Sequence, residues 1–544
     1  MACGANGFVY NLRHRIEIKA TPSFDFGAGA DVGMRLSELS HQPAVLQQVF
    51  LRWVGIGVSL VVAMIIAYWV GSQQTTLLAL CVGLVVVALV TGWMRDRAWM
   101  LIPLGWSLVG GSVFIPISLS VRDACILLSV CAYIGYRILS SRDLRQKLHA
   151  LDFILALNVM WIIVSFVRNP VGLRAFGSET IGGRGYINVF LALAAYWVII
   201  RLPDSAKSVS RVPYLFLAGT LLTALVNLVV YLLPAVTPVL FAFYTGIDVS
   251  SFLYSSPARP EAVTRWGNLA PFGVTLVFVL SALYPPRTLF NPLRPRFYVT
   301  ALAFATIFAS GFRNSLLWAF VALILGSWLH RGWREVVLGV VAAGLVSGVV
   351  VLGQGRAFQL PLPAQRTLSW LPGQWSPIVV AEAEQSMQGR FKWWQEVVKY
   401  NLIHNWWLGD GFGVAASDFE LLRTSQDFLT WMTLVGGFHN GPLTAIRVTG
   451  IVGLFLFYVY MIAAAVLSVK CVNRCRGTPL QMISIFLAIQ LVWGPLNYTF
   501  VFGAYDKQLP ETMLLVAVLL LVMKMREKLP LAQASAAPRA LKMI

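Results

Sequence analysis

The sequence predicts an all-α protein that crosses a membrane many times, and three observations support this fold class. Hydrophobic residues make up 58% of the 544 residues and charged residues only 12%, a composition that a soluble protein of this length does not need. The apolar runs are roughly 17–25 residues long, which is the length that a helix needs to cross a bilayer. They also lack the alternation of barrel strands, so helices are the structure that satisfies their backbone in lipid.

The apolar runs predict about fourteen transmembrane helices with both termini in the cytoplasm. A cytoplasmic tail over 1–49, without a removable signal peptide, precedes them, and a second tail covers 526–544. A large helical loop on the outer face, 354–440, divides helices 1–11 (50–353) from helices 12–14 (441–525). The predicted spans are 50–70, 75–94, 99–119, 122–140, 151–167, 186–201, 213–234, 268–285, 297–311, 314–330, 334–353, 441–469, 479–500 and 509–525.

The distribution of positive charge sets the predicted orientation. The net charge is +19, but the basic residues lie in every second short loop between spans, which is the positive-inside pattern rather than a nucleic-acid-binding surface. The basic positions include Arg95, Arg97, Arg137, Arg142, Arg145, Lys147, Arg201, Lys207, Arg211, Arg287, Arg294, Arg296, Arg331, Arg334, Lys470, Arg474 and Arg476.

Several classes of chemistry have no support in the sequence. There is no GxxxxGK[ST], GxGxxG or HExxH motif, so we expect neither a nucleotide cofactor nor a zinc site. None of the six cysteines lies in the predicted outer loop, which argues against a structural disulfide. Cys471 and Cys475 have i, i+4 spacing but lack a second pair of ligands, so we expect no metal there.

Arginines on the predicted outer face run against the orientation rule, so each needs a reason. Arg313 stands in Ser310-Gly311-Phe312-Arg313-Asn314, between two apolar runs with almost no loop. It is therefore held near the membrane surface, where it either snorkels to lipid phosphate or binds another anion. The other outer-face arginines before the long loop are Arg168, Arg174, Arg184, Arg259 and Arg265.

His439 is the main candidate for proton chemistry. It is followed by Asn440 and, after nine residues, by Gly450 and Gly453. An imidazole at the start of a membrane helix can exchange protons at the water boundary, although a lone histidine there can also serve as a cap. The two glycines leave a flat strip where another backbone can approach.

The predicted outer loop is rich in tryptophan, which either stacks on sugar rings or anchors helices at the interface. Residues 389–398, which include Arg390 and Trp394, have the spacing of an amphipathic helix lying on the membrane. Gly409, Gly411 and Gly413 follow as a glycine-rich turn. The second histidine of this loop, His404, is interpreted as structural.

On these residues the chain resembles the O-antigen ligase/polymerase superfamily, membrane glycosyltransferases that use lipid-linked sugars. The resemblance implies a GT-C-like architecture. The hydropathy pattern resembles the family from about residue 50 to 525, and the specific motifs cover about 265–453. Phe312 departs from the small residue that is common in the family. The resemblance rests on His439-Asn440 with Gly450 and Gly453, on Ser310 to Arg313, on Arg265 to Asn268, and on the run from Gly389-Arg390 through Trp394 to Gly413.

The resemblance implies a polyprenyl-pyrophosphate-linked glycan as donor and a sugar hydroxyl of a second glycan as acceptor, with no metal and no cofactor. His439 would be the general base, and Arg265 and Arg313 would hold the pyrophosphate. The implied substrate-binding residues are Arg390, Arg184, Asn440 and Trp394. The implied location is the bacterial inner membrane with the active site facing the periplasm, among membrane lipids and other polysaccharide-assembly proteins.

Three functions remain open from the sequence. A polymerase, which the long tryptophan-rich loop favours, would extend O-antigen or exopolysaccharide on a lipid carrier. A ligase would move the glycan to lipid A core. A polysaccharide or lipid transporter would need ionisable or broken sites near mid-membrane and repeated halves, whereas the acidic residues here lie almost wholly at span ends, as Asp123, Asp152 and Glu335 do.

Overall fold

The computed structural model divides the chain into two compact units, residues 1–86 and 87–544, and all the elements below belong to the second unit. The residues that the structure describes are Trp53, Gly92, 95–108, 110–111, 119–139, 148–169, 183–202, 205–244, 246–247, 265–414, Thr424 and 436–529.

Within these residues the regular secondary structure is helical, apart from two isolated β-bridges. Six of the helices are long and apolar enough to cross a membrane, and each overlaps a predicted span, so the all-α membrane class is confirmed. These are α6 (Ala150–Arg168), α8 with α9 (Ala206–Leu232), α16 (Trp333–Gly353), α21 (Gly441–Cys475), α22 (Gln481–Phe500) and α23 (Tyr505–Lys528).

Three of the remaining predicted spans lie partly or almost wholly outside the described residues. Span 99–119 begins as two short helices, η1 (Arg95–Met100) and α4 (Leu101–Trp106), and most of its second half lies outside the described residues. Spans 50–70 and 75–94 also lie outside the described residues, apart from Trp53 and Gly92. The number fourteen and the GT-C-like class therefore stay predictions. Five other spans coincide with α5 (Val121–Leu139), α7 (Arg184–Arg201), α12 (Leu269–Leu283), α14 (Pro295–Ser310) and α15 (Arg313–Arg331).

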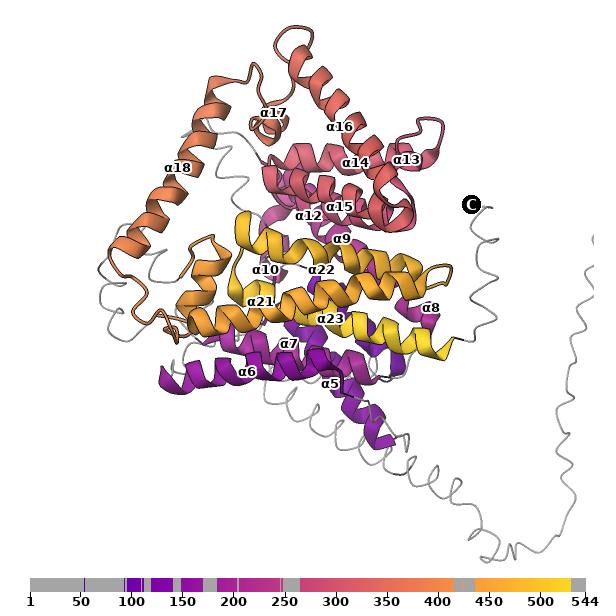
Figure 1. Cartoon of the computed structure of the whole chain (residues 1–544), viewed down its shortest axis with the longest axis vertical. Coiled ribbons are helices and arrows are strands. Elements are labelled where there is room, and N and C mark those ends of the chain that lie inside the picture. Colours follow the sequence, from indigo (N-terminus) through magenta and orange to yellow (C-terminus); the bar gives the residue numbers. More distant parts are fainter. Residues whose placement is uncertain are drawn as a thin grey trace, which may run out of the picture. The chain divides into compact units, whose positions relative to one another are not determined.

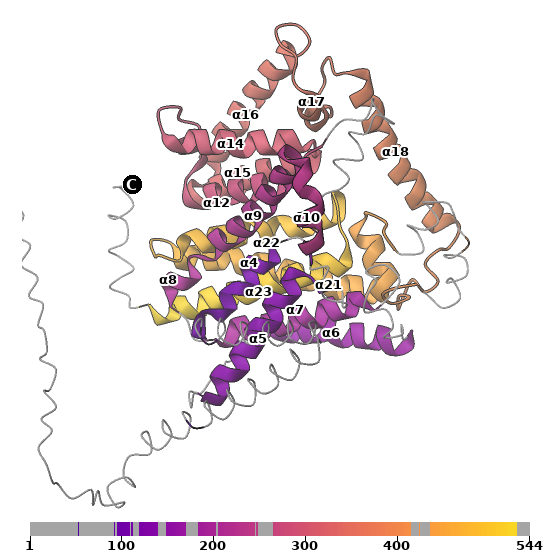
Figure 2. The same cartoon turned by 180° about the vertical axis from the view of Figure 1, so that it is seen from behind.

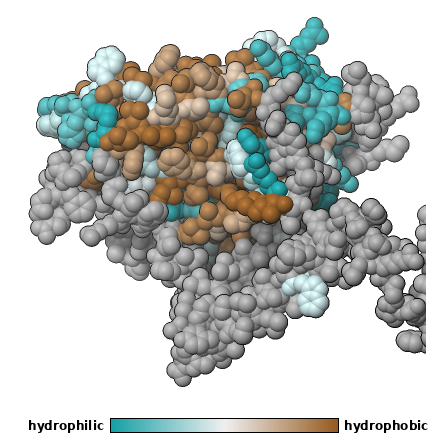
Figure 3. Space-filling view, turned by 90° about the horizontal axis from the view of Figure 1, so that it is seen from below, coloured by the Kyte–Doolittle hydropathy of each residue, from teal (hydrophilic) through white to brown (hydrophobic). Residues whose placement is uncertain are grey.

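The helices pack around α23, whose apolar window is 78% buried, against 6% for that of α16. A helix that is apolar on all sides belongs in an interior, and α23 is enclosed by α7, α21 and α22. Both views show α12, α14 and α15 as a group on one side of α21 to α23, with α6 and α7 on the other side (Figures 1 and 2). In Figure 3 the apolar residues form a broad belt between hydrophilic residues at the left and right, as expected of a protein surrounded by lipid.

The long loop contains two helices, α17 (Leu362–Leu368) and α18 (Pro377–Lys399). Pro377 suits the first turn of α18, because the amide hydrogen that proline lacks would have no helical acceptor there. The buried side chains of α18 are those of Val379, Ala383, Trp393 and Val397, which lie on one face. The helix predicted over 389–398 is therefore confirmed as part of α18, whereas its position on the membrane surface stays a prediction.

Helix α21 is kinked at Gly450, which has a φ of 68°. In a straight helix the carbonyls of Arg447 and Val448 would accept hydrogen bonds from Ile451 and Val452. Here they accept instead from Asp410 (2.7 Å) and Gly411 (3.0 Å) of the loop, while Ile451 and Val452 donate to the carbonyls of Trp406 (2.8 Å) and Trp407 (3.4 Å). The loop therefore enters the hydrogen-bond ladder of the helix, which is a recognised cause of kinks.

The predicted close approach at Gly450 is thus observed. A Cβ atom at this position would lie 2.1 Å from the carbonyl oxygen of Trp407. The positive φ of Gly450 is a second reason for glycine, because residues with a Cβ adopt it at a cost. Helix and loop are joined where only glycine fits.

We expect Gly450→Ala to destabilise the protein, because it combines a left-handed backbone, worth about 1–3 kcal/mol, with a clash against Trp407. The matched control is Gly344→Ala on α16, where nothing lies within 4 Å of an added Cβ. The midpoint of thermal unfolding in detergent should fall for Gly450→Ala only. Equal midpoints for both variants would contradict this account of the kink.

Candidate functional site

A small apolar core holds the segment that carries His439. It joins the last turns of α18, the turn after it and the first turns of α21, and Phe438 and Val397 within it have no exposed surface. Trp394 donates a hydrogen bond from its indole Nε1 to the carbonyl of Phe438 (2.9 Å). The backbone on the amino side of His439 is therefore fixed by packing and by one directed hydrogen bond. The core consists of Trp393, Val397, Ile403, Phe438 and Ile446.

On the other side of His439, Asn440 is the N-cap of α21. Its side-chain oxygen accepts a hydrogen bond from the amide of Leu443 (3.0 Å), as N-cap asparagines commonly do. Its side chain therefore holds the start of the helix. It fixes His439 through the backbone.

His439 itself has a φ of 50°, which is uncommon for a residue other than glycine. Its half-buried ring lies beside the ring of Trp393, at 6.0 Å between centroids, and beside that of Phe502, at 5.3 Å. Burial lowers the pKa of His439, and the positive charges of Arg390 and Lys507 lower it further. The imidazole is therefore neutral at neutral pH and is able to accept a proton.

Arg313 begins α15 two residues after Gly311, which ends α14 in a left-handed conformation. Its guanidinium donates to the carbonyl of Arg366 on α17 (3.1 Å) and to the hydroxyl of Ser369 (2.9 Å). Neither acceptor carries a charge, so these contacts orient Arg313 without neutralising it.

Glu382 of α18 lies between two arginines. Its carboxylate pairs with Arg265 and, at 3.1 Å, with Arg366. Arg366 also donates to the carbonyl of Gly311 (2.6 Å), next to Arg313. The structure thus brings Arg265 and Arg313 together around α17, as the sequence predicted, but the charge of Arg265 is shared with a carboxylate.

Arg390 links this group to His439. It is half-buried, and burial lowers the pKa of its guanidinium. Its charge acts on both Arg313 and His439. Within the described residues no carboxylate pairs with Arg390. We call Arg265, Arg313, Arg366, Arg390 and Lys507 the cationic cluster; Glu382 is the carboxylate paired within it.

Arg184 has a different environment. It is 4% exposed and its guanidinium pairs with Asp123, to which Arg122 also binds at 3.2 Å. This carboxylate already balances its charge inside the helix bundle, away from the contacts that define the cationic cluster. Arg174 and Arg259 lie outside the described residues.

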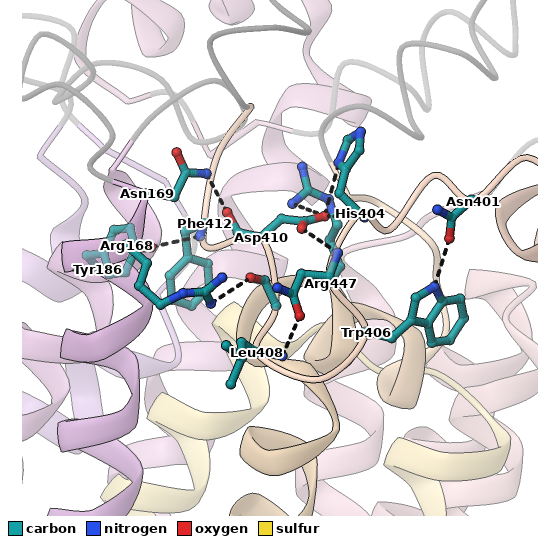
Figure 4. A network of polar contacts seen from close by, with 12 residues as sticks. Arg168, Asn169, Tyr186, Asn401, His404, Trp406, Leu408, Asp410, Phe412 and Arg447 are labelled. Atoms are coloured by element: carbon teal, nitrogen blue, oxygen red, sulfur yellow. Dashed lines mark hydrogen bonds and ion pairs between the residues drawn. The ribbon is translucent and has the colours of Figure 1, made fainter.

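Sequence reasoning missed a buried polar network beside the kink of α21 (Figure 4). Asp410 pairs with Arg447 at 3.1 Å and accepts hydrogen bonds from the amides of His404 (2.9 Å) and Asn405 (3.0 Å). The sequence did contain a signal for this network: Arg447 lies inside the apolar helix α21, and an arginine in such a helix needs a partner. The network anchors the glycine-rich turn, and His404 has a structural place in it.

A cavity of about 460 Å³ lies next to the candidate base and was also missed. Phe502, whose ring lies beside that of His439, forms part of its wall, as do Lys507 and Asn314. The site therefore has an imidazole, a group of cations and an adjoining open cavity. Among the described residues no group of three or more His, Cys, Asp or Glu side chains is arranged to hold a metal ion.

Residues 298–458 match the family model described as O-antigen ligase. The matched region runs from α14 into α21 and contains Arg313, Arg390 and His439. No match was found among curated proteins. Over the matched region the chain is similar to the O-antigen ligase family, which supports its resemblance to the O-antigen ligase/polymerase superfamily.

Proposed function

We propose that the chain is a metal-independent glycosyltransferase that polymerises polyprenyl-pyrophosphate-linked oligosaccharide repeats on the periplasmic face of the inner membrane. The observation that carries this proposal is the neutral imidazole of His439 beside a cationic cluster that contains one paired carboxylate. A base near an anion site is what transfer from a pyrophosphate leaving group requires.

In this proposal Arg313 and Arg390 bind the pyrophosphate, because neither has a carboxylate partner among the described residues. Guanidinium groups suit this anion, since they remain charged and bind phosphate oxygens in pairs. Arg265 contributes a weaker attraction, because its positive charge is partly neutralised by Glu382. Arg184, paired with Asp123, supports the fold rather than the anion.

The reaction balances with these groups alone. An acceptor hydroxyl attacks the anomeric carbon of the donor sugar, and a new glycosidic C–O bond forms. The bond from that carbon to the pyrophosphate breaks, so polyprenyl pyrophosphate leaves with the electron pair, stabilised by Arg313 and Arg390. The proton of the hydroxyl passes to His439. Trp394 acts as a positioning residue through its bond to Phe438.

A ligase is the second candidate, because the matched family model is described as O-antigen ligase. The same base and anion site would then transfer the glycan to lipid A core. The two functions differ in the acceptor and in the product, not in the bond that is made.

We expect His439→Ala and Arg313→Ala each to lower transfer by at least about 100-fold, because they remove the base and an oriented cation. The assay is expression in a host that lacks its own polymerase, followed by gel separation of lipid-linked and lipid-A-linked glycans. Long ladders on the lipid carrier would identify a polymerase, and single repeats on lipid A a ligase.

The matched controls are His404→Ala and Arg331→Ala. The side chain of His404 is 57% exposed, and Arg331 is an exposed partner of Glu335. Both controls should retain wild-type products at equal protein levels in the membrane. Wild-type products from His439→Ala would remove this residue from the mechanism.

We also expect a specific pH dependence. The base form of His439 is needed, so kcat/KM should fall as the pH drops through its lowered pKa. Lys507→Gln removes one of the charges that depress this pKa, so the acid limb should move to higher pH by up to about one unit. Lys507→Arg keeps the charge and should leave the limb in place. An unmoved limb in Lys507→Gln would show that another group titrates.

A further inference from the structure

The cavity beside His439 has a lining that membrane lipid does not explain. It lies among α4, α9, α12, α15, α22 and α23, and its wall includes the aromatic side chains of Trp106, Trp318 and Phe486. It also includes the polar side chains of Asn314, Gln490, Gln508 and Glu511. Polar groups among membrane helices are costly unless they bind a polar partner. The cavity is within the size range of small-molecule sites.

Two of these polar groups lack protein partners within the described structure. The side-chain oxygen of Asn314 is buried and accepts no hydrogen bond. The carboxylate of Glu511 forms neither a hydrogen bond nor an ion pair with a described residue, although Lys507 is one helical turn away on α23. By contrast, Asn497 in the same wall accepts from Trp318 Nε1 (2.9 Å) and donates to the carbonyl of Phe502 (3.1 Å).

Lys507 is near enough to His439 to act on its imidazole, and Glu511 follows about 6 Å further along α23, at 1.5 Å per residue. A phosphate is attracted to the Lys507 end of this wall. An isoprenoid chain would leave Asn314 and Glu511 without donors. A ligand of many hydroxyl groups satisfies both acceptors and also stacks on aromatic faces.

We propose that this cavity is a sugar-binding subsite, in which a pyranose ring of the glycan donates hydroxyl hydrogen bonds to Glu511 and Asn314 and packs against Trp318. This proposal rests on the proposed glycosyltransferase function and adds the residues that select the sugar. The ring belongs either to the acceptor, whose hydroxyl must reach His439, or to the donor.

A binding experiment tests the subsite without requiring turnover. The full-length protein in lipid nanodiscs is illuminated with octyl glucoside that carries a diazirine on the sugar, or with farnesyl diphosphate that carries one on the isoprenoid. The sugar probe should label peptides from α15 and α23, and free glucose should compete. Glu511→Leu should lower this labelling about tenfold, as expected for loss of a charge-assisted hydrogen bond, whereas Glu335→Gln, outside the cavity lining, should not.

Several results would overturn the subsite. One is labelling of the cavity by the isoprenoid probe and not by the sugar probe. Another is equal labelling of wild type and Glu511→Leu by the sugar probe. Glu511→Gln keeps the shape of the side chain, and unfolding midpoints of both variants show whether a loss of labelling reflects a loss of fold.

Kinetics with lipid-linked glycans then identify the source of the sugar. If the acceptor occupies the subsite, Glu511→Gln raises the KM for the acceptor about tenfold and leaves the KM for the donor unchanged; the reverse identifies the donor. Two unchanged KM values contradict the subsite while leaving the transferase function intact. A wild-type protein without any glycan product contradicts the function itself, and the photolabelling result still reports on the cavity.

Discussion

The exchange of hydrogen bonds between the kinked helix α21 and the loop over 406–411 is the interaction on which the rest of the site depends. Where the ladder of α21 opens at Gly450, its free carbonyls and amides are taken up by backbone groups of the loop. The buried pair of Asp410 and Arg447 secures the same junction, and breaking one partner of such a pair is costly, about 3–5 kcal/mol. Because α18 leads into this loop and His439 precedes α21, the junction sets the position of both chemical elements, the imidazole and Arg390.

A second constraint is the limited number of carboxylates near the cations. Glu382 joins Arg265 to Arg366, and Arg366 in turn binds the backbone of Gly311 beside Arg313. One acid thus assembles arginines from separate parts of the chain without neutralising all of them. Like charges gathered in a half-buried space repel one another, so the arrangement stores an electrostatic cost that a bound anion relieves. Burial, together with this repulsion, keeps the imidazole of His439 in its basic form.

Sequence reasoning succeeded where a pattern is local and failed where partners come from distant segments. The apolar runs predicted the six long helices, and the two glycines after Asn440 predicted a close backbone approach at Gly450. The balance of charge could not be predicted in this way. Arg184 and Arg265 look alike in sequence, as outer-face arginines, yet one is neutralised within the bundle by Asp123 and the other shares Glu382. Arg447 and Glu511 could not be singled out from the sequence. The role of Arg447 depends on its ion pair with Asp410, and that of Glu511 depends on a cavity formed by helices from distant segments.

The groups around His439 constrain how a substrate can lie. Arg313 on α15 and Arg390 on α18 have no carboxylate partner among the described residues, so a pyrophosphate gains by staying with them. The wall of the cavity offers hydrogen-bond acceptors and aromatic faces instead, which suit an uncharged sugar. Different surroundings within one site thus separate the leaving group from the sugar, and His439 lies near both, because Arg390 acts on its imidazole and Phe502 of the cavity wall lies beside its ring.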